Sequence, residues 1–350
     1  MKVLDLLNLN YKKELPFVVY RKPNSESICG FFCENNSLIF TDTFKESGFV
    51  FAPFNNESKT ILFSHKNSTF VEEEIVELSI NENKNEHFKS EFGKDFHIEL
   101  VNKAVKTLKN TDLQKVVISR KEEVLLAEFN FLNTFKKLLN NYPNAMVYVW
   151  FHPKIGLWLG ATPETLLTLE DSIFTTMSLA GTQLFKGDLN VVWKNKEIEE
   201  QQLVSDFIEH QISSLSENFT IEKAKSIRAG SLLHLKSRVE GSLKSNSTLK
   251  ELIMALHPTP AVCGLPRDMA RDFIVNNENY KRDFYTGFLG EINRQTNNKL
   301  KSNLFVNLRC MNIIANKANI YVGGGITKDS IAEHEWQETV AKTTTMKSVL

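Results

Sequence analysis

The chain has 350 residues and a mass of 40.1 kDa, and 42% of its residues are hydrophobic, which is enough to bury a sizeable globular core. Its 42 basic and 42 acidic residues give a formal net charge of +0, and the two signs are mixed along the sequence. This balance excludes the strongly basic surfaces that are typical of nucleic-acid binding, so no nucleic-acid partner is expected.

The amino-terminal segment and the cysteines indicate where the protein is found. MKVLDLLNLNYKKELPF has charges within its apolar stretch and no small-residue cleavage site, so it is not a secretory signal. No apolar segment is long enough to cross a bilayer. Cys29 and Cys33 are close in sequence, Cys263 and Cys310 are distant, and no pair of CxxC motifs indicates zinc, so reduced, buried thiols are predicted. These features predict a cytoplasmic protein that does not bind membranes.

The first ninety residues have few distinctive patterns. LPFVVYRKP and SICGFFCENNSLIF predict strands, and residues 55–97, rich in Asn, Lys, Glu and Ser, predict surface loops with short strands. No linker rich in Pro or Gly divides the chain. We therefore predict a single domain over residues 1–350, with a less recognisable part at 1–91 and a motif-bearing part at 92–350.

From about Asp95 the predicted elements become clearer. FHIELVNKAVKTLKN and NFLNTFKKLLNNY predict helices on either side of a strand in LQKVVISRKEEVLL. The strand-like runs AMVYVWFHP, GLWLGATPETLLTLE and SIFTTMSLAGTQ then follow one another with short breaks. Such close succession favours antiparallel pairing over connections through helices.

The second half of the chain continues this mixture. NKEIEEQQLVSDFIEHQISSL predicts a long amphipathic helix. STLKELIMALHP and PRDMARDFIVNN predict shorter helices, the first with Ser247 or Thr248 as its N-cap. Strands are predicted in FYTGFLGEIN, NLFVNLRCMNII and NIYVGGG, and a final helix begins at about Asp329. The whole pattern predicts an α+β fold with a large antiparallel sheet system and helices outside it.

The final helix has two acids and a base on one face. Glu335, Glu338 and Lys342 are three and four residues apart, so they fall within a narrow arc. A solvated face with ordinary ion pairs is the simpler interpretation of this spacing alone. The Gly323–Gly325 run just before it favours a ligand site, because consecutive glycines let backbone N–H groups approach an anion.

Three other motifs allow both a structural and a functional interpretation. Lys115 lies in an apolar strand, where it could mark a sheet edge or, in a closed site, act as a base. Glu164 follows Pro163 between strands. Glu200 lies on the long predicted helix, where the simpler interpretation is that it belongs to a solvent-exposed face. The proline-rich HPTPAVCGLP at 257–266 is by composition a rigid loop.

Together and in this order, these segments resemble the chorismate-utilising enzymes, the family that includes isochorismate, salicylate, anthranilate and aminodeoxychorismate synthases. The resemblance covers roughly residues 92–350 and implies two large, mostly antiparallel sheets packed face to face, with helices outside. It also implies a cleft for chorismate, a small dicarboxylate, and one Mg²⁺. Nine motifs carry it: KVVISR, GATPETLL, LAGT, EEQQLV, LHPTPAVCG, YTGFLGEI, NLRC, GGGIT and EWQETVAK.

The resemblance also implies roles for individual residues. Glu200 and Glu338 match the metal ligands, and Glu335, one turn earlier, matches a group that holds metal-bound water. The family's histidine after the first ligand is replaced here by Gln201. Mg²⁺ prefers oxygen ligands and keeps several waters, so few carboxylates are needed. The substrate-binding residues implied in the same way are Gly324, Gly325, Lys342, Arg309, Tyr285, Thr182 and His234.

Two positions indicate which member of the family the chain resembles most. Ala180 stands before GT, where aminodeoxychorismate synthases typically have an attacking lysine, and it leaves room for water. The HPTPAVCG loop, with Ala261 and Val262, looks most like that of isochorismate synthases. The implied isomerisation has Lys115 as the base that activates water for attack at C2 of chorismate. Glu164 is the acid that protonates the leaving C4 hydroxyl.

Three alternatives remain open. A salicylate synthase would form isochorismate and then eliminate pyruvate in the same site, using nearly the same residues. An aminating enzyme of the anthranilate synthase type would need ammonia from a glutaminase partner, whereas an isochorismate synthase needs no obligatory protein partner. A non-catalytic anion-binding module could have kept the fold. A menaquinone and a siderophore pathway are equally compatible with the sequence.

Overall fold

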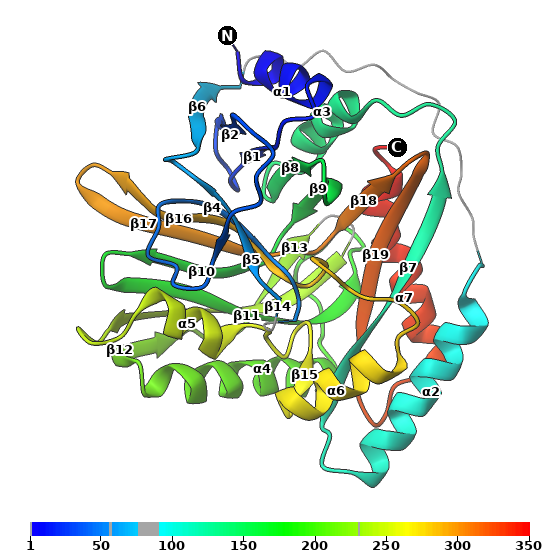
Figure 1. Cartoon of the computed structure of the whole chain (residues 1–350). Coiled ribbons are helices and arrows are strands. Elements are labelled where there is room, and N and C mark those ends of the chain that lie inside the picture. Colours follow the sequence, from blue (N-terminus) through cyan, green and yellow to red (C-terminus); the bar gives the residue numbers. More distant parts are fainter. Residues whose placement is uncertain (1, 56–57, 76–90, 230–231) are drawn as a thin grey trace.

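The computed structural model describes residues 2–55, 58–75, 91–229 and 232–350. Two large antiparallel sheets pack against each other, and helices cover their outer sides (Figure 1). This arrangement confirms the α+β fold predicted from the sequence. The first sheet has nine strands in the order β15 (Gly264–Leu265), β7 (Lys115–Leu125), β19 (Lys317–Ile326), β18 (Cys310–Ile314), β9 (Gly156–Thr162), β8 (Met146–His152), β1 (Phe17–Arg21), β2 (Ser27–Cys33) and β6 (Ser68–Glu74).

The second sheet has ten strands and includes amino-terminal strands as well. One of its strands, β13 (Lys225–Ala229), pairs only with β14 and lies off the main path. The others follow the order β12 (Ser216–Ile221), β14 (Leu232–Leu243), β11 (Ile173–Leu184), β10 (Thr165–Glu170), β17 (Lys299–Val306), β16 (Phe288–Thr296), β4 (Gly48–Ala52), β5 (Thr60–Ser64) and β3 (Phe40–Thr41).

Seven helices are described, and each packs an apolar face on a sheet or on another helix. Helices α1 and α3 share a core with β1 and β8 of the first sheet, α2 and α6 pack beside β7, and α4 and α5 cover the second sheet. None of the described helices is long and apolar enough to span a bilayer. Their bounds are α1 (Val3–Lys12), α2 (Lys94–Asn110), α3 (Phe131–Asn141), α4 (Asn195–Ser213), α5 (Leu249–Leu256), α6 (Arg267–Asn277) and α7 (Ala332–Lys347).

Local sequence signals explain several helix boundaries. At α5, the Thr248 hydroxyl accepts a hydrogen bond from the backbone N–H of Glu251, and the Glu251 carboxylate accepts one from the backbone N–H of Thr248. This reciprocal capping box satisfies two amides that would otherwise lack partners at the helix start. It confirms Thr248, one of the two predicted candidates, as the N-cap.

Aromatic side chains fill the space between the sheets. Phe51 of β4 stacks on Phe284 with ring centroids 4.2 Å apart, and Phe63 of β5 stacks on Trp150 of β8 at 5.3 Å. Phe51 also contacts Trp150, with ring centroids 4.8 Å apart, so Trp150 of the first sheet packs on Phe51 and Phe63 of the second. Large rings bury much apolar surface and pack with preferred geometry, so they fix how the two sheets face each other.

The chain crosses between the sheets at two places near the cavity. The first crossing confirms the prediction that Glu164 lies between strands, because β9 ends at Thr162, β10 begins at Thr165, and the two strands belong to different sheets. The continuous strand predicted over 303–314 is wrong, because β17 ends at Val306 and β18 begins in the other sheet. Arg309 lies in this second crossing with a φ of 47°. A hydrogen bond of 3.0 Å from the backbone N–H of Val306 to the carbonyl of Glu164 joins the two crossings.

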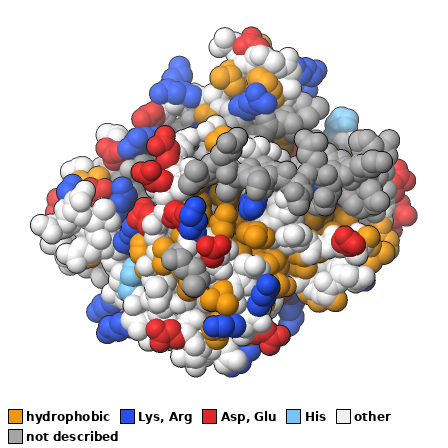
Figure 2. Space-filling view, turned by 90° about the horizontal axis from the view of Figure 1, so that it is seen from above, with side chains coloured by type: hydrophobic (Ala, Val, Ile, Leu, Met, Phe, Trp, Pro, Cys, Tyr) orange, Lys and Arg blue, Asp and Glu red, His pale blue; other side chains and the backbone are white. Residues whose placement is uncertain are grey.

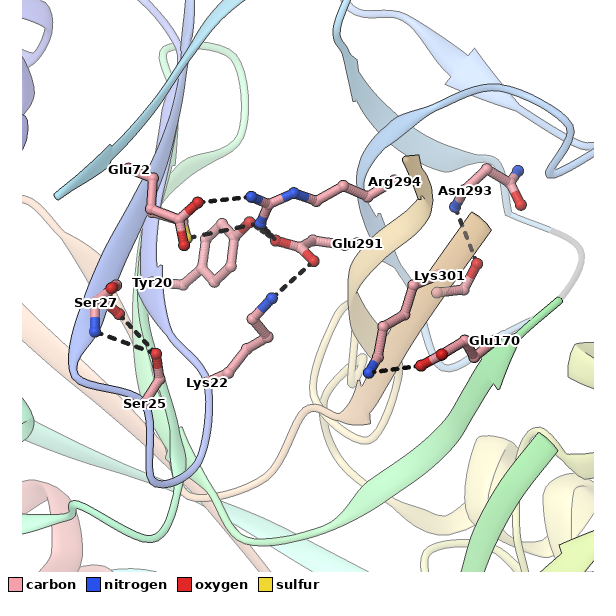
Figure 3. A network of polar contacts seen from close by, with 12 residues as sticks. Tyr20, Lys22, Ser25, Ser27, Glu72, Glu170, Glu291, Asn293, Arg294 and Lys301 are labelled. Atoms are coloured by element: carbon pink, nitrogen blue, oxygen red, sulfur yellow. Dashed lines mark hydrogen bonds and ion pairs between the residues drawn. The ribbon is translucent and has the colours of Figure 1, made fainter. Parts of the chain in front are cut away.

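An ion network centred on the buried Glu291 also joins the sheets (Figure 3). Glu291 of β16 accepts a hydrogen bond from the hydroxyl of Tyr20 on β1, and it pairs with Lys22 at 3.1 Å and Arg294 at 2.9 Å. Arg294 also reaches Glu72 of β6 at 2.7 Å. Burial alone would raise the pKa of Glu291, but Lys22, Tyr20 and Arg294 outweigh it and lower that pKa. The network therefore ties the second sheet to the first through charge.

Charges on the molecular surface are mixed. Acidic and basic side chains alternate on the face shown in Figure 2, and neither sign forms a continuous area there. This distribution agrees with the formal net charge of +0.

Candidate active site

The cavity beside the two crossings is bounded by β19, by the first turns of α4 and by α7. The space between its walls, including the part that is open to solvent, is about 930 Å³. Among its lining residues are fourteen of the fifteen that the sequence predicts: Glu164, Ala180, Thr182, Glu200, His234, Ala261, Val262, Tyr285, Arg309, Gly324, Gly325, Glu335, Glu338 and Lys342.

Lys115, the fifteenth predicted residue, lies just behind the cavity wall. It belongs to β7, its side chain is 1% exposed, and its Nζ is 2.9 Å from Oε1 of Glu200. A Cβ atom built on Gly325 would lie 3.1 Å from Cε of Lys115 and 2.6 Å from the same Glu200 oxygen. The lysine therefore lies behind the wall next to Gly325 and contacts Glu200, which lines the cavity.

Each of the three carboxylates predicted at the metal site has a lysine partner. Glu200 pairs with Lys115, Glu335 pairs with Lys196 at 3.0 Å, and Glu338 pairs with Lys342 at 2.6 Å. Within the described ranges, no three His, Cys, Asp or Glu side chains converge closely enough to form a metal-binding group. In this arrangement ammonium groups neutralise the acids.

The glycines at 323–325 are part of strand β19, and at Gly324 and Gly325 the missing side chains leave space for nearby carboxylates. Gly323, Gly324 and Gly325 pair with Ser119, Ile118 and Val117 of β7. A Cβ on Gly324 would lie 3.6 Å from oxygens of both Glu335 and Glu338, and one on Gly325 would collide with Glu200. The missing side chains thus let carboxylates from α4 and α7 approach the same stretch of β19.

Glu164 is the buried acid of the site. Burial raises its pKa to about 7, while Lys115, then Arg309 and Lys342, oppose this rise without cancelling it. Its position follows from the crossing, where Val306 fixes its backbone carbonyl and Thr162 Oγ1 donates a hydrogen bond to the carbonyl of Val306 at 2.5 Å. A carboxyl group of this kind carries a proton about half the time near neutral pH, as a general acid requires.

Arg309 is the cation available for an anionic ligand. Its guanidinium lines the cavity, and no salt bridge joins it to a carboxylate in the described part of the chain. Burial lowers its pKa, and Tyr285, Glu338 and Glu164 oppose this effect. Tyr285 stacks against Tyr321 with centroids 5.4 Å apart, which holds the phenol beside Arg309 in the wall. A planar guanidinium in such a position suits a carboxylate.

His234 and Thr182 form the opposite wall. Nδ1 of His234 is 2.8 Å from the carbonyl oxygen of Gly181 and 3.4 Å from Oγ1 of Thr182. Because a carbonyl can only accept, this nitrogen carries the hydrogen and Nε2 of the ring is the acceptor. Burial, and then Arg309 and Lys342, lower the pKa of His234 to about 3, so the ring is neutral.

Small side chains complete the cavity. Ala180 precedes Gly181, whose φ of 72° lies in the left-handed region, and Ala261 and Val262 belong to the proline-rich loop. None of these three side chains carries a nucleophile. The wall beside the Thr182 hydroxyl therefore leaves space for a water molecule.

Sequence reasoning missed Lys196. This residue lines the cavity, binds Glu335 and lies 3.4 Å from the hydroxyl of Ser330. Burial alone would lower the pKa of Lys196, but Glu335 and, more weakly, Glu200 and Glu338 raise it. Its position four residues before Glu200 places both on one face of α4, which is the signal that could have identified it.

The carboxylates of the cavity are chemically suitable ligands for a hard divalent cation. Glu200, Glu335 and Glu338 supply the oxygen ligands that Mg²⁺ prefers, and all three line one wall. Burial raises the pKa of Glu335, Lys196 opposes this rise, and the neighbouring Glu338 adds to it. Acids crowded together in this way gain stability from an added positive charge.

Three comparisons place the chain among known proteins. The family model described as "Chorismate binding enzyme" matches residues 53–350. Isochorismate synthase DhbC of Bacillus subtilis is 32% identical over 198 residues, which are 54% of this chain and 49% of that protein. Anthranilate synthase component 1 of Lactococcus lactis is 28% identical over 291 residues, 78% of this chain and 60% of that protein.

The fold comparison agrees with these sequence matches. The solved structure of DhbC from Bacillus anthracis aligns with a TM-score of 0.80 and 21% identity, over 99% of each chain. The curated relatives named above are matched over only about half of their length. Because the family model covers most of the described residues, the chain belongs to the chorismate binding enzyme family.

Proposed function

We propose that this protein is an Mg²⁺-dependent isochorismate synthase that converts chorismate to isochorismate. The observation that carries the proposal is Glu164, a buried acid with a pKa of about 7 in a cavity that is also lined by Arg309 and Glu200, with Lys115 paired to Glu200 behind the wall. The relative DhbC of Bacillus subtilis, which is named an isochorismate synthase, supports the same assignment.

The reaction adds water at C2 of the ring and removes the hydroxyl at C4. Lys115 acts as the base and takes one proton from water while the remaining hydroxide forms the new C–O bond at C2. The ring double bonds shift, and the C–O bond at C4 breaks as Glu164 gives its proton to the departing hydroxyl, which leaves as water. Return of a proton from Lys115 to Glu164 restores both groups, so the net reaction is an isomerisation.

The cavity walls hold the substrate in register with these two groups. Arg309 and Tyr285 bind the enolpyruvyl carboxylate, and Lys342 with the strand at Gly324 and Gly325 faces the ring carboxylate. Ala180 leaves space for the attacking water, since no side chain there reaches the ring. Such positioning lowers the barrier because the reacting atoms are already oriented.

Glu200 and Glu338, with Glu335 beside them, would hold the Mg²⁺. When bound, the ion supplies positive charge for the ring carboxylate and fixes its orientation. Each of these carboxylates is paired with a lysine: Glu200 with Lys115, Glu335 with Lys196 and Glu338 with Lys342. To bind the ion, the carboxylates would have to weaken these ion pairs.

Product identification tests the proposal directly. The purified chain, with no added protein, is incubated with chorismate with and without Mg²⁺, and the products are separated by chromatography. Isochorismate that forms only with Mg²⁺ is the expected result. Enzymatic salicylate and pyruvate would identify a salicylate synthase, and ammonia-dependent anthranilate would identify the aminating type, to which a second relative belongs by name. The absence of any turnover of chorismate would favour a non-catalytic anion-binding module.

A further inference from the structure

A buried polar cluster lies where α4 packs on β11 and β14, one helical turn after Glu197, which lines the cavity. The amide nitrogen of Gln201 is 2.8 Å from the hydroxyl of Ser178 on β11, 3.0 Å from that of Ser205 on α4 and 3.0 Å from that of Ser237 on β14. Ser178 and Ser205 are also bonded to each other at 2.7 Å. All four side chains are at most 5% exposed, and none of them lines the cavity.

Apolar side chains surround this cluster. Val204 and Ile208 of α4 pack with Val239 of β14 in the same core. Apolar contact depends on the area buried and hardly on direction, so it permits small rotations of a helix on a sheet. Hydrogen bonds require aligned donors and acceptors. The amide of Gln201, bonded to hydroxyls on two different strands, therefore fixes how α4 is rotated about its axis.

The rotation of α4 decides where Glu200 lies. Successive helical residues are about 100° apart, so a helix that directs Gln201 to the strands directs Glu200 toward the cavity. A rotation of about 20° would move a side-chain tip about 5 Å from the axis by about 2 Å. Glu200 has little such freedom, since it lies between Lys115 at 2.9 Å and the bare backbone of Gly325.

We infer that Gln201 is a positioning residue that holds the Glu200 carboxylate in place for a divalent cation. This inference rests on the proposed function, in which Glu200 is a metal ligand. The amide acts entirely through the helix and touches neither the substrate nor the ion. The three serines are part of the same device, because they supply the oxygens that the amide hydrogens meet.

Mn²⁺ binding to the whole purified chain, measured by titration calorimetry, tests the inference without relying on turnover. Gln201→Met keeps the length of the side chain and removes the amide. Gln202→Met is the matched control, because Gln202 is exposed and its amide donates a hydrogen bond to Asp206 on the same helix. We expect Gln201→Met to weaken Mn²⁺ binding at least tenfold and Gln202→Met to leave it within twofold of the original chain.

Turnover provides a second measurement. In Gln201→Met the Mg²⁺ concentration for half-maximal activity should rise at least tenfold, while the KM for chorismate at saturating Mg²⁺ stays within about twofold. Normal Mn²⁺ affinity combined with a lower melting temperature would show that the cluster is only structural and would overturn the inference. If Gln201→Met does not fold, Ser237→Ala is measured instead. A smaller loss of Mn²⁺ affinity is expected in this variant, and an unchanged Mn²⁺ affinity would overturn the inference.

Glu200→Gln separates this inference from the proposed function. A loss of Mn²⁺ binding in Glu200→Gln without any loss in Gln201→Met overturns the positioning role alone. Equal Mn²⁺ binding by Glu200→Gln and the original chain overturns the assignment of Glu200 as a metal ligand and, with it, the inference.

Discussion

At Glu164, the fold changes the chemistry of a single carboxyl group. Burial raises its pKa from the usual 4.5 to about 7, although Lys115, Arg309 and Lys342 all oppose the change. The native state therefore holds the proton more tightly than the unfolded chain does. The same shift serves two purposes, because it supplies a proton donor near neutral pH and it costs stability whenever the group has to be ionised.

The pH dependence of the rate follows from this acid. Glu164 has to be protonated to release the C4 hydroxyl, so kcat/KM for isochorismate formation should fall about tenfold per pH unit above pH 7. Glu164→Gln should lower kcat by about 10²–10⁴-fold and remove this alkaline limb. Steady-state rates between pH 6 and pH 9 check both expectations, and an unchanged limb in the variant would assign it to another group.

The stability of the folded chain should also fall as the pH rises. Since the pKa of Glu164 is raised in the folded state, the native protein loses stability as pH rises from 4.5 through 7. The difference between these pKa values corresponds to about 3 kcal/mol. Glu164→Gln should therefore be more stable than the original chain at pH 8.5 by up to about 3 kcal/mol, with little difference near pH 5. Urea unfolding at the two pH values measures it, and equal differences at both would contradict the assigned pKa.

Lys115 is tested by removing its amine. Lys115→Ala should abolish turnover, because no other described amine contacts Glu200 at this point of the wall. The change leaves the Glu200 carboxylate without its partner at the edge of the cavity, where water can reach it, so the fold should persist. Circular dichroism checks the fold and product formation checks the activity. Near-normal rates in this variant would show that Lys115 is not the base.

At the scale of elements, the glycines of β19 allow carboxylates from α4 and α7 to approach the same stretch of this strand. Gly325→Ala would place a Cβ 2.6 Å from Glu200 and should lower kcat/KM about 10²-fold, as expected when a reacting group is displaced by about 1 Å. Gly324→Ala is the comparison, because its Cβ would lie 3.6 Å from Glu335 and Glu338 without displacing either carboxylate, so a loss of activity in it reports on substrate space alone and should be smaller. Melting temperatures of both variants show whether the strand itself is intact, and equal losses of activity would argue against this account.

Elements also show what the sequence could and could not predict. Helix α5 could be placed because Thr248 and Glu251 form a local cap, and the pattern around Lys115 predicts a strand by itself. The break between strands at Arg309 could not be predicted, because NLFVNLRCMNII is rich in strand-forming residues and has no Gly or Pro to mark the crossing. Lys196 was missed for a similar reason, since its contact with Glu335 joins residues 139 positions apart.

For the molecule as a whole, the cavity depends on how the two sheets are held together. Aromatic rings such as Phe51 and Trp150 fill the space between them, and the network around Glu291 adds charged contacts away from the cavity. The residues that join the sheets at the cavity come from both crossings, at Glu164 and Arg309. The network around Glu291 has no described residue in the cavity wall, so it can be perturbed separately from substrate binding.

Glu291→Gln tests this separation. The Glu291 carboxylate is 2% exposed, so removing its charge leaves Lys22 and Arg294 without their shared partner, and we expect a loss of about 3 kcal/mol in the free energy of unfolding. Turnover of chorismate should be unchanged, since Glu291 does not line the cavity. Glu170→Gln is the control, because Glu170 pairs with exposed lysines and its loss should leave unfolding unaffected.

The pH dependence of the same variant gives the final check. The pKa of Glu291 is lowered in the folded state, so its contribution is complete above about pH 4.5 and is lost as pH falls through the lower, folded-state value. The stability difference between the original chain and Glu291→Gln should thus be constant from pH 6 to pH 8 and shrink below pH 4.5. Urea unfolding across this range measures it. A difference that stayed the same at pH 3 would mean that packing around the side chain, and not its charge, joins the two sheets.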